Sequence, residues 1–217
     1  IWDYEFDLPL DNLFNELIDF WKITFPNLNF SKEKVLNDLN EFTNQRVLSH
    51  LEELSIGKDI IKATSFIDSY TEKRIINILD LKNRINTIEQ LKKRENFSEI
   101  QKVISRVSKL AEKGNLNKNI FSYTGYVNPD LFEKECEIKV FEFIKSLERL
   151  LSIPNWNYVE LFNLFEINTN KINELFDNEK GVLVMVENYE IRNNRLNLLS
   201  LIRNFSLKLA DFTLFNS

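Results

Sequence analysis

The chain has 217 residues, of which 43% are hydrophobic and 28% are charged, and its formal net charge is −5. This balance excludes a disordered tail, and the lack of any apolar run near the roughly 20 residues of a spanning helix excludes a membrane-embedded chain. One cysteine and one histidine exclude a disulfide framework and a metal site built from thiolates or imidazoles, and four glycines with four prolines are too few for the turns of a sandwich or barrel.

Apolar residues recur at intervals of three and four residues in the first part of the chain, which is the pattern of amphipathic helices. The predicted helical ranges are 8–22, 32–54, 58–67 and a further helix that Thr71 caps, with its apolar face from Ile75 to Ile88. Pro26 marks the break after the first helix, Ser31 is the expected N-cap of the second, and Gly57 is expected to end it.

The second part of the chain shows the same periodicity. The predicted helical ranges are 98–113, 128–151, 155–177 and 188–210. Asn128 and Pro129 form a helix-start signal, and Asn188 is the expected N-cap of the last helix. Residues 114–128 form the one long loop and are expected to be the most mobile internal segment. The apolar run 182–186 is expected to be a buried turn or a helix start, because a single short strand would have no partner.

Together these ranges predict an all-α fold, a helical bundle of about nine helices. The chain begins with Ile1 rather than methionine, and residues 1–20 contain six acidic and no basic residues, which is unlike a signal peptide. We therefore expect the chain to be part of a longer cytoplasmic protein.

The chain by itself contains no recognisable catalytic constellation. Neither glycine-rich phosphate-binding motif, G-x-x-x-x-G-K-[ST] or G-x-G-x-x-G, is present. His50 is the only histidine, and Cys136 stands between Glu135 and Glu137, whose negative charges disfavour a reactive thiolate. We therefore expect a non-catalytic chain that holds no cofactor of its own, with Cys136 as a packing residue.

The charges are segregated along the chain. Residues 92–118 carry eight basic and three acidic side chains, and residues 191–210 carry four basic side chains and no acid. The spacing of four, three and four places one group of basic residues on a single helical face, here called the basic stripe: Lys102, Arg106, Lys109 and Lys113. This stripe is either an ordinary solvated face or a track for phosphates on an otherwise acidic protein.

Four motifs follow one another in the last third of the chain. They are Leu175–Asp177 (LFD), Gly181–Glu187 (GVLVMVE), Ile191–Leu199 (IRNNRLNLL) and Leu209–Phe212 (LADF). In their order and spacing they resemble the end of the β subunit of bacterial glycyl-tRNA synthetase. Val127–Glu133 and Ile104–Leu110 resemble upstream parts of the same family, and Val47–Leu51 does so more loosely.

This resemblance implies a helical anticodon-binding domain of the DALR type over residues 92–217, preceded by a helical body segment over residues 1–91. It implies an α2β2 glycine--tRNA ligase whose α subunit carries glycine, ATP and Mg together with the adenylate chemistry. It also implies that the β subunit binds tRNA(Gly) and that this part of it is not catalytic.

Anticodon bases are unpaired and are read by stacking and by hydrogen bonds to their edges, so basic and amide side chains are the expected contacts. The expected RNA-binding residues are Lys102, Arg106, Lys109, Arg192, Asn193, Asn194, Arg195 and Arg203. In the alternative interpretation, Arg192 and Arg195 pair with Glu187 or Glu190 inside the domain, and Asn193 braces its helix.

Two further expectations concern the last helix. Leu196, Leu199 and Phe205 should face the core while Arg192, Arg195 and Arg203 stay accessible, and the basic faces of helices 98–113 and 188–210 should converge on one surface. The rival hypothesis is a helical adaptor that binds protein, such as the α subunit, without contacting RNA. The acidic first helix and the aromatic residues Trp2, Tyr4 and Phe6 would suit that role.

Overall fold

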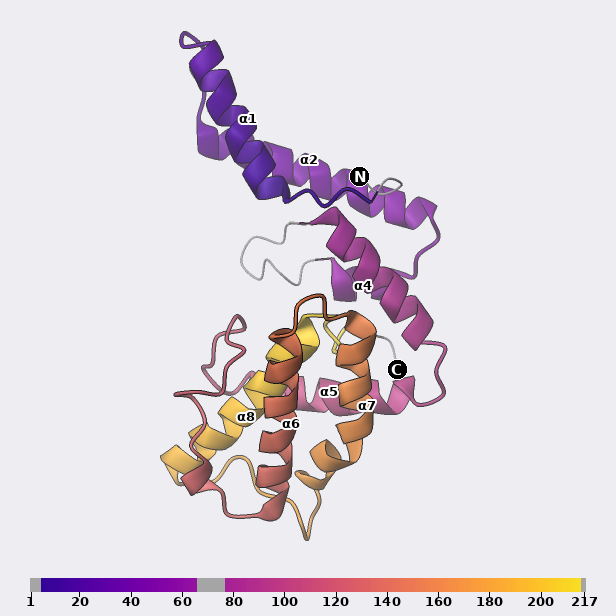
Figure 1. Ribbon diagram of the computed structural model, residues 1–217, viewed down its shortest axis with the longest axis vertical. Coiled ribbons are helices and arrows are strands. Elements are labelled where there is room, and N and C mark those ends of the chain that lie inside the picture. The colour runs from indigo at the N-terminus through magenta and orange to yellow at the C-terminus, as the bar shows by residue number, and fades with distance from the viewer. Residues whose placement is uncertain (1–4, 66–76, 216–217) are drawn as a thin grey trace. The chain divides into compact units, whose positions relative to one another are not determined.

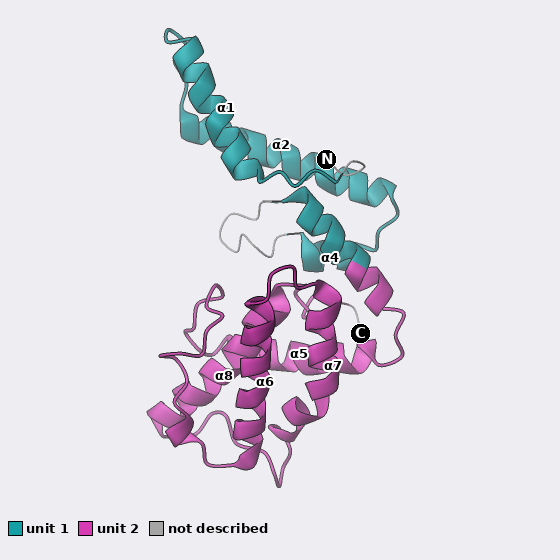
Figure 2. Ribbon diagram, in the orientation of Figure 1, with its two compact units in different colours: residues 1–86 teal, residues 87–217 magenta. Residues whose placement is uncertain are grey.

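The computed structural model describes residues 5–65 and 77–215, which contain eight α-helices, one 3-10 helix and no strand. The predicted all-α class is therefore confirmed for the described part of the chain (Figure 1). The chain divides into two compact units, residues 1–86 and residues 87–217, with the division inside α4 (Ile78–Leu91) (Figure 2). The functional division into 1–91 and 92–217 stays a prediction.

Unit 1 begins with two helices that pack against each other, α1 (Leu10–Thr24) and α2 (Lys32–Glu53). Ser31 is the N-cap of α2, as predicted, and its hydroxyl accepts a hydrogen bond from the Lys34 amide. The expectation that Gly57 ends α2 is wrong, because the chain turns at Ser55, whose φ is 59°, and Gly57 instead precedes α3 (Lys58–Thr64). The predicted Thr71 cap and the predicted face residue Ile75 lie outside the described residues.

Unit 2 is built from four helices in two layers: α5 (Phe97–Ala111), α6 (Glu135–Leu151), α7 (Tyr158–Glu174) and α8 (Tyr189–Leu207). One layer pairs α6 with α7 and the other pairs α5 with α8, and the layers meet through α6–α8 and α5–α7 contacts (Figure 1). An aromatic cluster closes one part of this core: Phe97, Phe162, Phe212 and Phe215. No helix in the described ranges combines the length and the apolarity needed to cross a membrane.

One predicted helix start and one predicted helix end are placed differently in the structure. Asn128 and Pro129 open only a single 3-10 turn (Pro129–Leu131), and α6 begins at Glu135. The last helix has the predicted N-cap, since the Asn188 side chain accepts from the amides of Glu190 and Ile191, but it ends at Leu207 rather than near residue 210. The described residues form eight α-helices and one 3-10 helix, which agrees with the prediction of about nine helices.

The helix α8 is the central element of unit 2. Every residue from 194 to 207 is buried, so the helix has no solvated face along most of its length. The predicted core positions Leu196, Leu199 and Phe205 are confirmed. The prediction that Arg195 and Arg203 are accessible is wrong, since they are only 2% and 5% exposed. A central helix buries its polar face as well as its apolar face.

The polar side chains of α8 are bonded to backbone carbonyls of the 114–128 loop. Asn204 donates to the carbonyls of Asn117 and Ile120, each at 2.8 Å, and Arg203 donates to the carbonyl of Leu116 at 2.9 Å. The loop also has apolar anchors, because Leu116 and Val127 are buried. The expectation that it is the most mobile internal segment stays a prediction.

Candidate nucleic-acid interface

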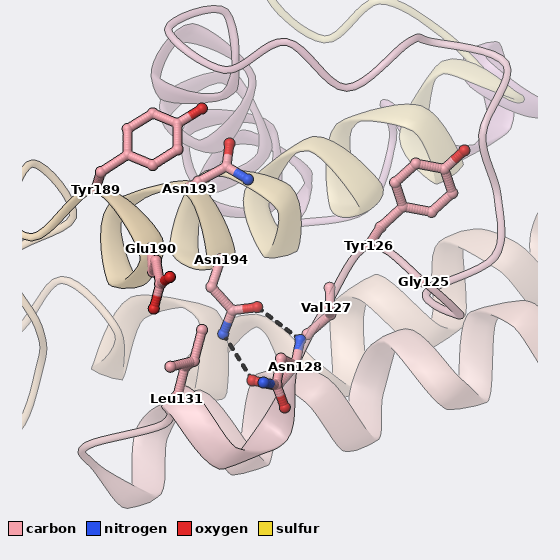
Figure 3. Close-up of a pocket in the computed structure, with 9 residues that line it drawn as sticks. All are labelled: Gly125, Tyr126, Val127, Asn128, Leu131, Tyr189, Glu190, Asn193 and Asn194. Carbon is pink, nitrogen blue, oxygen red and sulfur yellow. Dashed lines mark hydrogen bonds between the residues drawn. The ribbon is translucent and has the colours of Figure 1, made fainter.

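A cavity of about 500 Å³ opens on unit 2 where the 114–128 loop meets the first turns of α8. We call it the tyrosine pocket. Its lining comes from the end of the loop, the 3-10 turn and the start of α8: Gly125, Tyr126, Val127, Asn128, Leu131, Tyr189, Glu190, Asn193 and Asn194 (Figure 3). The pocket lies wholly within one compact unit, so its geometry is set by that unit alone.

Two asparagines of α8 hold the loop side of the pocket in place. The Asn194 amide both accepts from the Asn128 backbone N–H at 2.7 Å and donates to the Asn128 carbonyl at 2.9 Å, as Figure 3 shows. One helical turn away, the Asn197 side chain donates to the Tyr126 carbonyl at 2.6 Å. Because buried, hydrogen-bonded polar groups favour one arrangement, these bonds fix the loop backbone beside the start of α8.

The open surfaces of the pocket are aromatic rings and amides. Tyr126 is 41% exposed and Tyr189 is 66% exposed. In Figure 3 the two rings lie toward opposite ends of the pocket, and Asn193 lies on α8 between them. Exposed tyrosine rings are platforms on which unpaired bases stack, and an amide offers both a donor and an acceptor to a base edge.

The charge of the pocket favours a base over a phosphate. None of the described lining residues is a lysine or an arginine, and Glu190, which is exposed, is one of them. A carboxylate repels a phosphate, whereas it can accept a hydrogen bond from the amino group of a base. The arrangement therefore suits recognition of a base edge.

The structure separates the eight predicted site residues into two groups. Lys102, Arg106 and Lys109 are exposed on α5, and Asn193 is half-buried in the tyrosine pocket. Arg192 is also half-buried, and it donates to the backbone carbonyls of Val186 and Glu187 rather than to a carboxylate. The other three, Asn194, Arg195 and Arg203, are buried and bonded inside unit 2.

Arg195 belongs to a buried ion-pair network. Its guanidinium lies 2.9 Å from a Glu137 carboxylate oxygen and 2.6 Å from a Glu133 oxygen, and it also donates to the Leu183 carbonyl. Burial alone would lower the pKa of Arg195, but the hydrogen bonds to Glu137 and Glu133 outweigh it and raise the pKa above its ordinary value. The predicted internal pairing of Arg195 is thus correct in kind, but its partners are not Glu187 or Glu190.

The predicted convergence of the basic faces of α5 and α8 is wrong for Arg195 and Arg203. The two helices do pack side by side, as predicted. However, α5 contacts α8 through its buried face, which includes Val107, while the basic stripe is exposed to solvent. The stripe therefore forms a surface without the buried arginines of α8.

Sequence reasoning missed the residues that give the pocket its rings. Tyr126 precedes the helix-start signal at Asn128, and Tyr189 follows the cap at Asn188, so both stand beside recognised boundaries. Large aromatic residues at exposed helix starts and loop ends are a signal for binding that charge patterning alone does not include.

Comparison with known proteins supplies the remaining observation. No protein-family model matches the chain. The chain is 31% identical over 211 residues to the glycine--tRNA ligase beta subunit of Gloeothece citriformis, covering 95% of this chain and 29% of that protein. It is 29% identical over 216 residues to the same subunit of Acaryochloris marina, covering 98% and 30% of the two chains. The beta subunit of Persephonella marina is 28% identical over 195 residues, covering 89% of this chain and 24% of that protein.

Proposed function

The chain belongs to the glycine--tRNA ligase beta subunit family, and we propose that it is the C-terminal part of such a subunit, which binds tRNA(Gly) by its anticodon loop. The chain spans 29% to 30% of the length of the first two relatives, and we propose that the activity of the whole enzyme also requires other segments. The observation that carries the proposal is the tyrosine pocket, which presents stacking surfaces and an edge-reading amide together.

The pocket fits the chemistry of an anticodon loop. Bases of such a loop are unpaired, so they can be turned outward, stacked on tyrosine and read at their edges. In our proposal Tyr126 and Tyr189 stack with bases, and Asn193 hydrogen-bonds to one base edge. The exposed basic stripe of α5 supplies contacts to phosphates.

The other parts of the enzyme are proposed from the relatives' names and from the motif resemblance. We propose an α subunit as the partner, with glycine activation by ATP and Mg on that subunit and no catalytic residue in this chain. The DALR type of anticodon-binding domain and a cytoplasmic location belong to the same proposal.

A nitrocellulose filter assay tests the proposal. The 217-residue chain is titrated against a tRNA(Gly) transcript and against the same transcript with its anticodon exchanged, at low and high salt. We expect tighter binding of tRNA(Gly), and affinity should fall with salt by about 0.7 log units per log unit for each phosphate contact. Equal binding of both transcripts would contradict anticodon recognition.

A protein-binding role for unit 1 is the second candidate function, because α1 and α2 expose a large apolar surface. A groove of about 440 Å³ lies between them, lined mainly by apolar side chains including Leu17, Trp21 and Phe30. Trp21 is 50% exposed, Ile23 is 81% exposed and Phe6 is 56% exposed, whereas Trp2 and Tyr4 lie outside the described residues. Exposed apolar surface of this kind marks a protein interface.

One variant, measured for binding to the α subunit and to tRNA(Gly), distinguishes the two candidate functions. If unit 1 binds the α subunit, Ile23→Glu should abolish co-elution with purified α subunit in size-exclusion chromatography and leave tRNA(Gly) binding unchanged. A chain that co-elutes with the α subunit and never binds tRNA would favour the adaptor role alone.

A further inference from the structure

A second cavity on unit 2 has a different chemical character from the tyrosine pocket. It encloses about 340 Å³ between α5 and the segment that follows α7. The residues that matter here are Arg106 and Leu110 of α5 with Phe176, Asp177, Leu183 and Met185 of that segment. We call it the arginine cavity.

Arg106 is the cationic group of this cavity. Its guanidinium carbon lies 4.2 Å from the centre of the Phe176 ring, so one face of the guanidinium is covered by the ring. Within the described part of the chain, Arg106 has neither an ion pair nor a hydrogen bond, in contrast to Arg94 and Arg195, which pair with carboxylates. The exposed Arg106 side chain therefore keeps its N–H donors and its second face for a ligand.

The opposite wall is apolar and is fixed in position. Leu183 is 71% exposed and Met185 is 44% exposed, while Val184 between them is buried. Two arginine side chains of α8 hold the backbone behind these side chains. Arg195 donates to the Leu183 carbonyl and Arg192 donates to the Val186 carbonyl. The exposed Leu183 and Met185 side chains therefore give the cavity an apolar wall whose backbone is fixed, as is common in ligand pockets.

The turn that leads into this wall is also fixed. The Asp177 carboxylate accepts from the amides of Glu179 and Lys180, and these two bonds lower its pKa. Lys134 of the α6 N-cap donates to the carbonyls of Glu179 and Gly181. These bonds hold the Asp177 carboxylate at the turn, and in the described part of the chain it forms no ion pair with Arg106.

Positive charge surrounds the arginine cavity on the side formed by α5. Lys102 and Lys109 are exposed on the same helix as Arg106, and Lys113 is exposed in the turn that follows it. A cavity with one apolar wall and a row of exposed cations beside it matches a nucleotide, whose base is apolar on its faces and whose phosphate is anionic. A purely apolar protein segment would leave this row of cations unmatched.

We infer that the arginine cavity is a second nucleotide-binding site of this chain, which takes one unpaired base of the bound tRNA while the basic stripe contacts the neighbouring phosphates. The base lies against Leu183 and Met185 and stacks on the open face of Arg106, and the guanidinium edge donates to a phosphate oxygen. This inference rests on the proposed function, because the ligand is the same tRNA.

The test uses matched pairs of variants in the filter assay with tRNA(Gly). Leu183→Asp places a negative charge against the base. Its control is Ile167→Asp, the same kind of change at an apolar side chain of α7. Ile167 is 73% exposed and lines neither cavity. We expect Leu183→Asp to weaken binding about tenfold, as for loss of a stacked base, and Ile167→Asp to bind like the unmodified chain. Both variants change exposed side chains, and unchanged thermal unfolding confirms that they fold.

The second pair is Arg106→Gln with Arg149→Gln as its control, since Arg149 is also exposed and lies on α6 outside both cavities. Arg106→Gln should weaken binding and reduce the slope of log affinity against log salt by about 0.7, whereas Arg149→Gln should change neither. Leu183→Asp and Arg106→Gln should weaken tRNA(Gly) and the anticodon-exchanged transcript by the same factor, because the two transcripts share this nucleotide.

The outcomes separate this inference from the proposed function. If Leu183→Asp and Arg106→Gln bind like their controls while Asn193→Ala still loses anticodon discrimination, the second site is overturned and anticodon recognition stands. If Leu183→Asp loses binding to the α subunit but not to tRNA, the cavity binds protein and the inference is overturned. Failure of the unmodified chain to bind tRNA(Gly) would overturn both proposals.

Discussion

The guanidinium of Arg195 lies 2.9 Å from a carboxylate oxygen of Glu137, and the two side chains, from α8 and α6, are 3% and 0% exposed. This pair joins two layers of unit 2 at a point where neither charge reaches water. The same Glu137 carboxylate accepts from the backbone amides of Glu133 and Lys134, so it also closes the start of α6.

Replacing Arg195 with methionine should destabilise the chain strongly. The change leaves the Glu137 carboxylate buried beside an apolar side chain, and breaking one partner of such a pair costs about 3–5 kcal/mol. Urea unfolding followed by circular dichroism measures the loss. Arg149→Met, at an exposed arginine of α6, should stay within about 0.5 kcal/mol of the unmodified chain. A loss below about 1 kcal/mol for Arg195→Met would show that water reaches this pair in solution.

Asn204 should control the order of the 114–128 loop. Its side-chain amide is fully buried and bonds two loop carbonyls, so Asn204→Leu leaves both carbonyls without their donor. Hydrogen exchange should become faster across residues 115–124. Asn168→Leu removes a buried amide on α7 that bonds only within its own helix, and it should leave exchange in the loop unchanged. Equal exchange in the loop for both variants would contradict this role.

Gly181 should not tolerate alanine. A Cβ there would lie 2.5 Å from the Asp177 carbonyl oxygen and 2.6 Å from the Leu175 carbonyl oxygen, so the 177–181 turn would have to open. Overpacking of this kind costs roughly 1–3 kcal/mol, and limited proteolysis should cut between residues 177 and 187. Gly125→Ala has no atom within 4 Å but must hold a φ of 79°, so it should cost about 1 kcal/mol without exposing that segment. An uncut Gly181→Ala variant would argue against the tight turn.

Cys136 should resist alkylation in the folded chain. Burial and the neighbouring Glu137 charge raise the pKa of its thiol above the ordinary value of 9.0. Because the folded state holds the proton more tightly, this group stabilises the fold below its unfolded pKa, and the contribution is lost as pH rises through the folded pKa. Iodoacetamide at pH 9 should therefore label Cys136 slowly in buffer and rapidly in urea, and the unmodified chain should lose more stability than Cys136→Ala above pH 9. Equal labelling rates in both solvents would contradict the buried thiol.

The helices could be predicted from sequence because their signals are local. Ser31 and Asn188 are caps in both the prediction and the structure, and the 3.6-residue period placed Leu199 in the core. The burial of Arg195 and Arg203 could not be predicted this way, because it depends on α8 being surrounded by other elements. Their partners, Glu137 and the Leu116 carbonyl, are 58 and 87 residues away in the sequence.

In the candidate site, too, features set by neighbouring residues could be predicted and features set by residues far apart in the sequence could not. Asn193 was identified from its own motif, and it does line the tyrosine pocket. The pocket itself forms because Asn194 bonds the backbone of Asn128, which is 66 residues away in the sequence. Periodicity describes the faces of one helix, so it could not show that the loop carrying Tyr126 meets the start of α8.

The measurement that tests the central claim most directly is the ratio of affinities for tRNA(Gly) and for its anticodon-exchanged transcript, determined for the unmodified chain and for Asn193→Ala. We expect the unmodified chain to prefer tRNA(Gly), and Asn193→Ala to lose about 1–3 kcal/mol of that preference, by analogy with a single contact to a base edge. Asn170→Ala, at an exposed asparagine of α7, should keep the full preference. A ratio of one for the unmodified chain, or an unchanged ratio for Asn193→Ala, would contradict recognition of the anticodon by the tyrosine pocket.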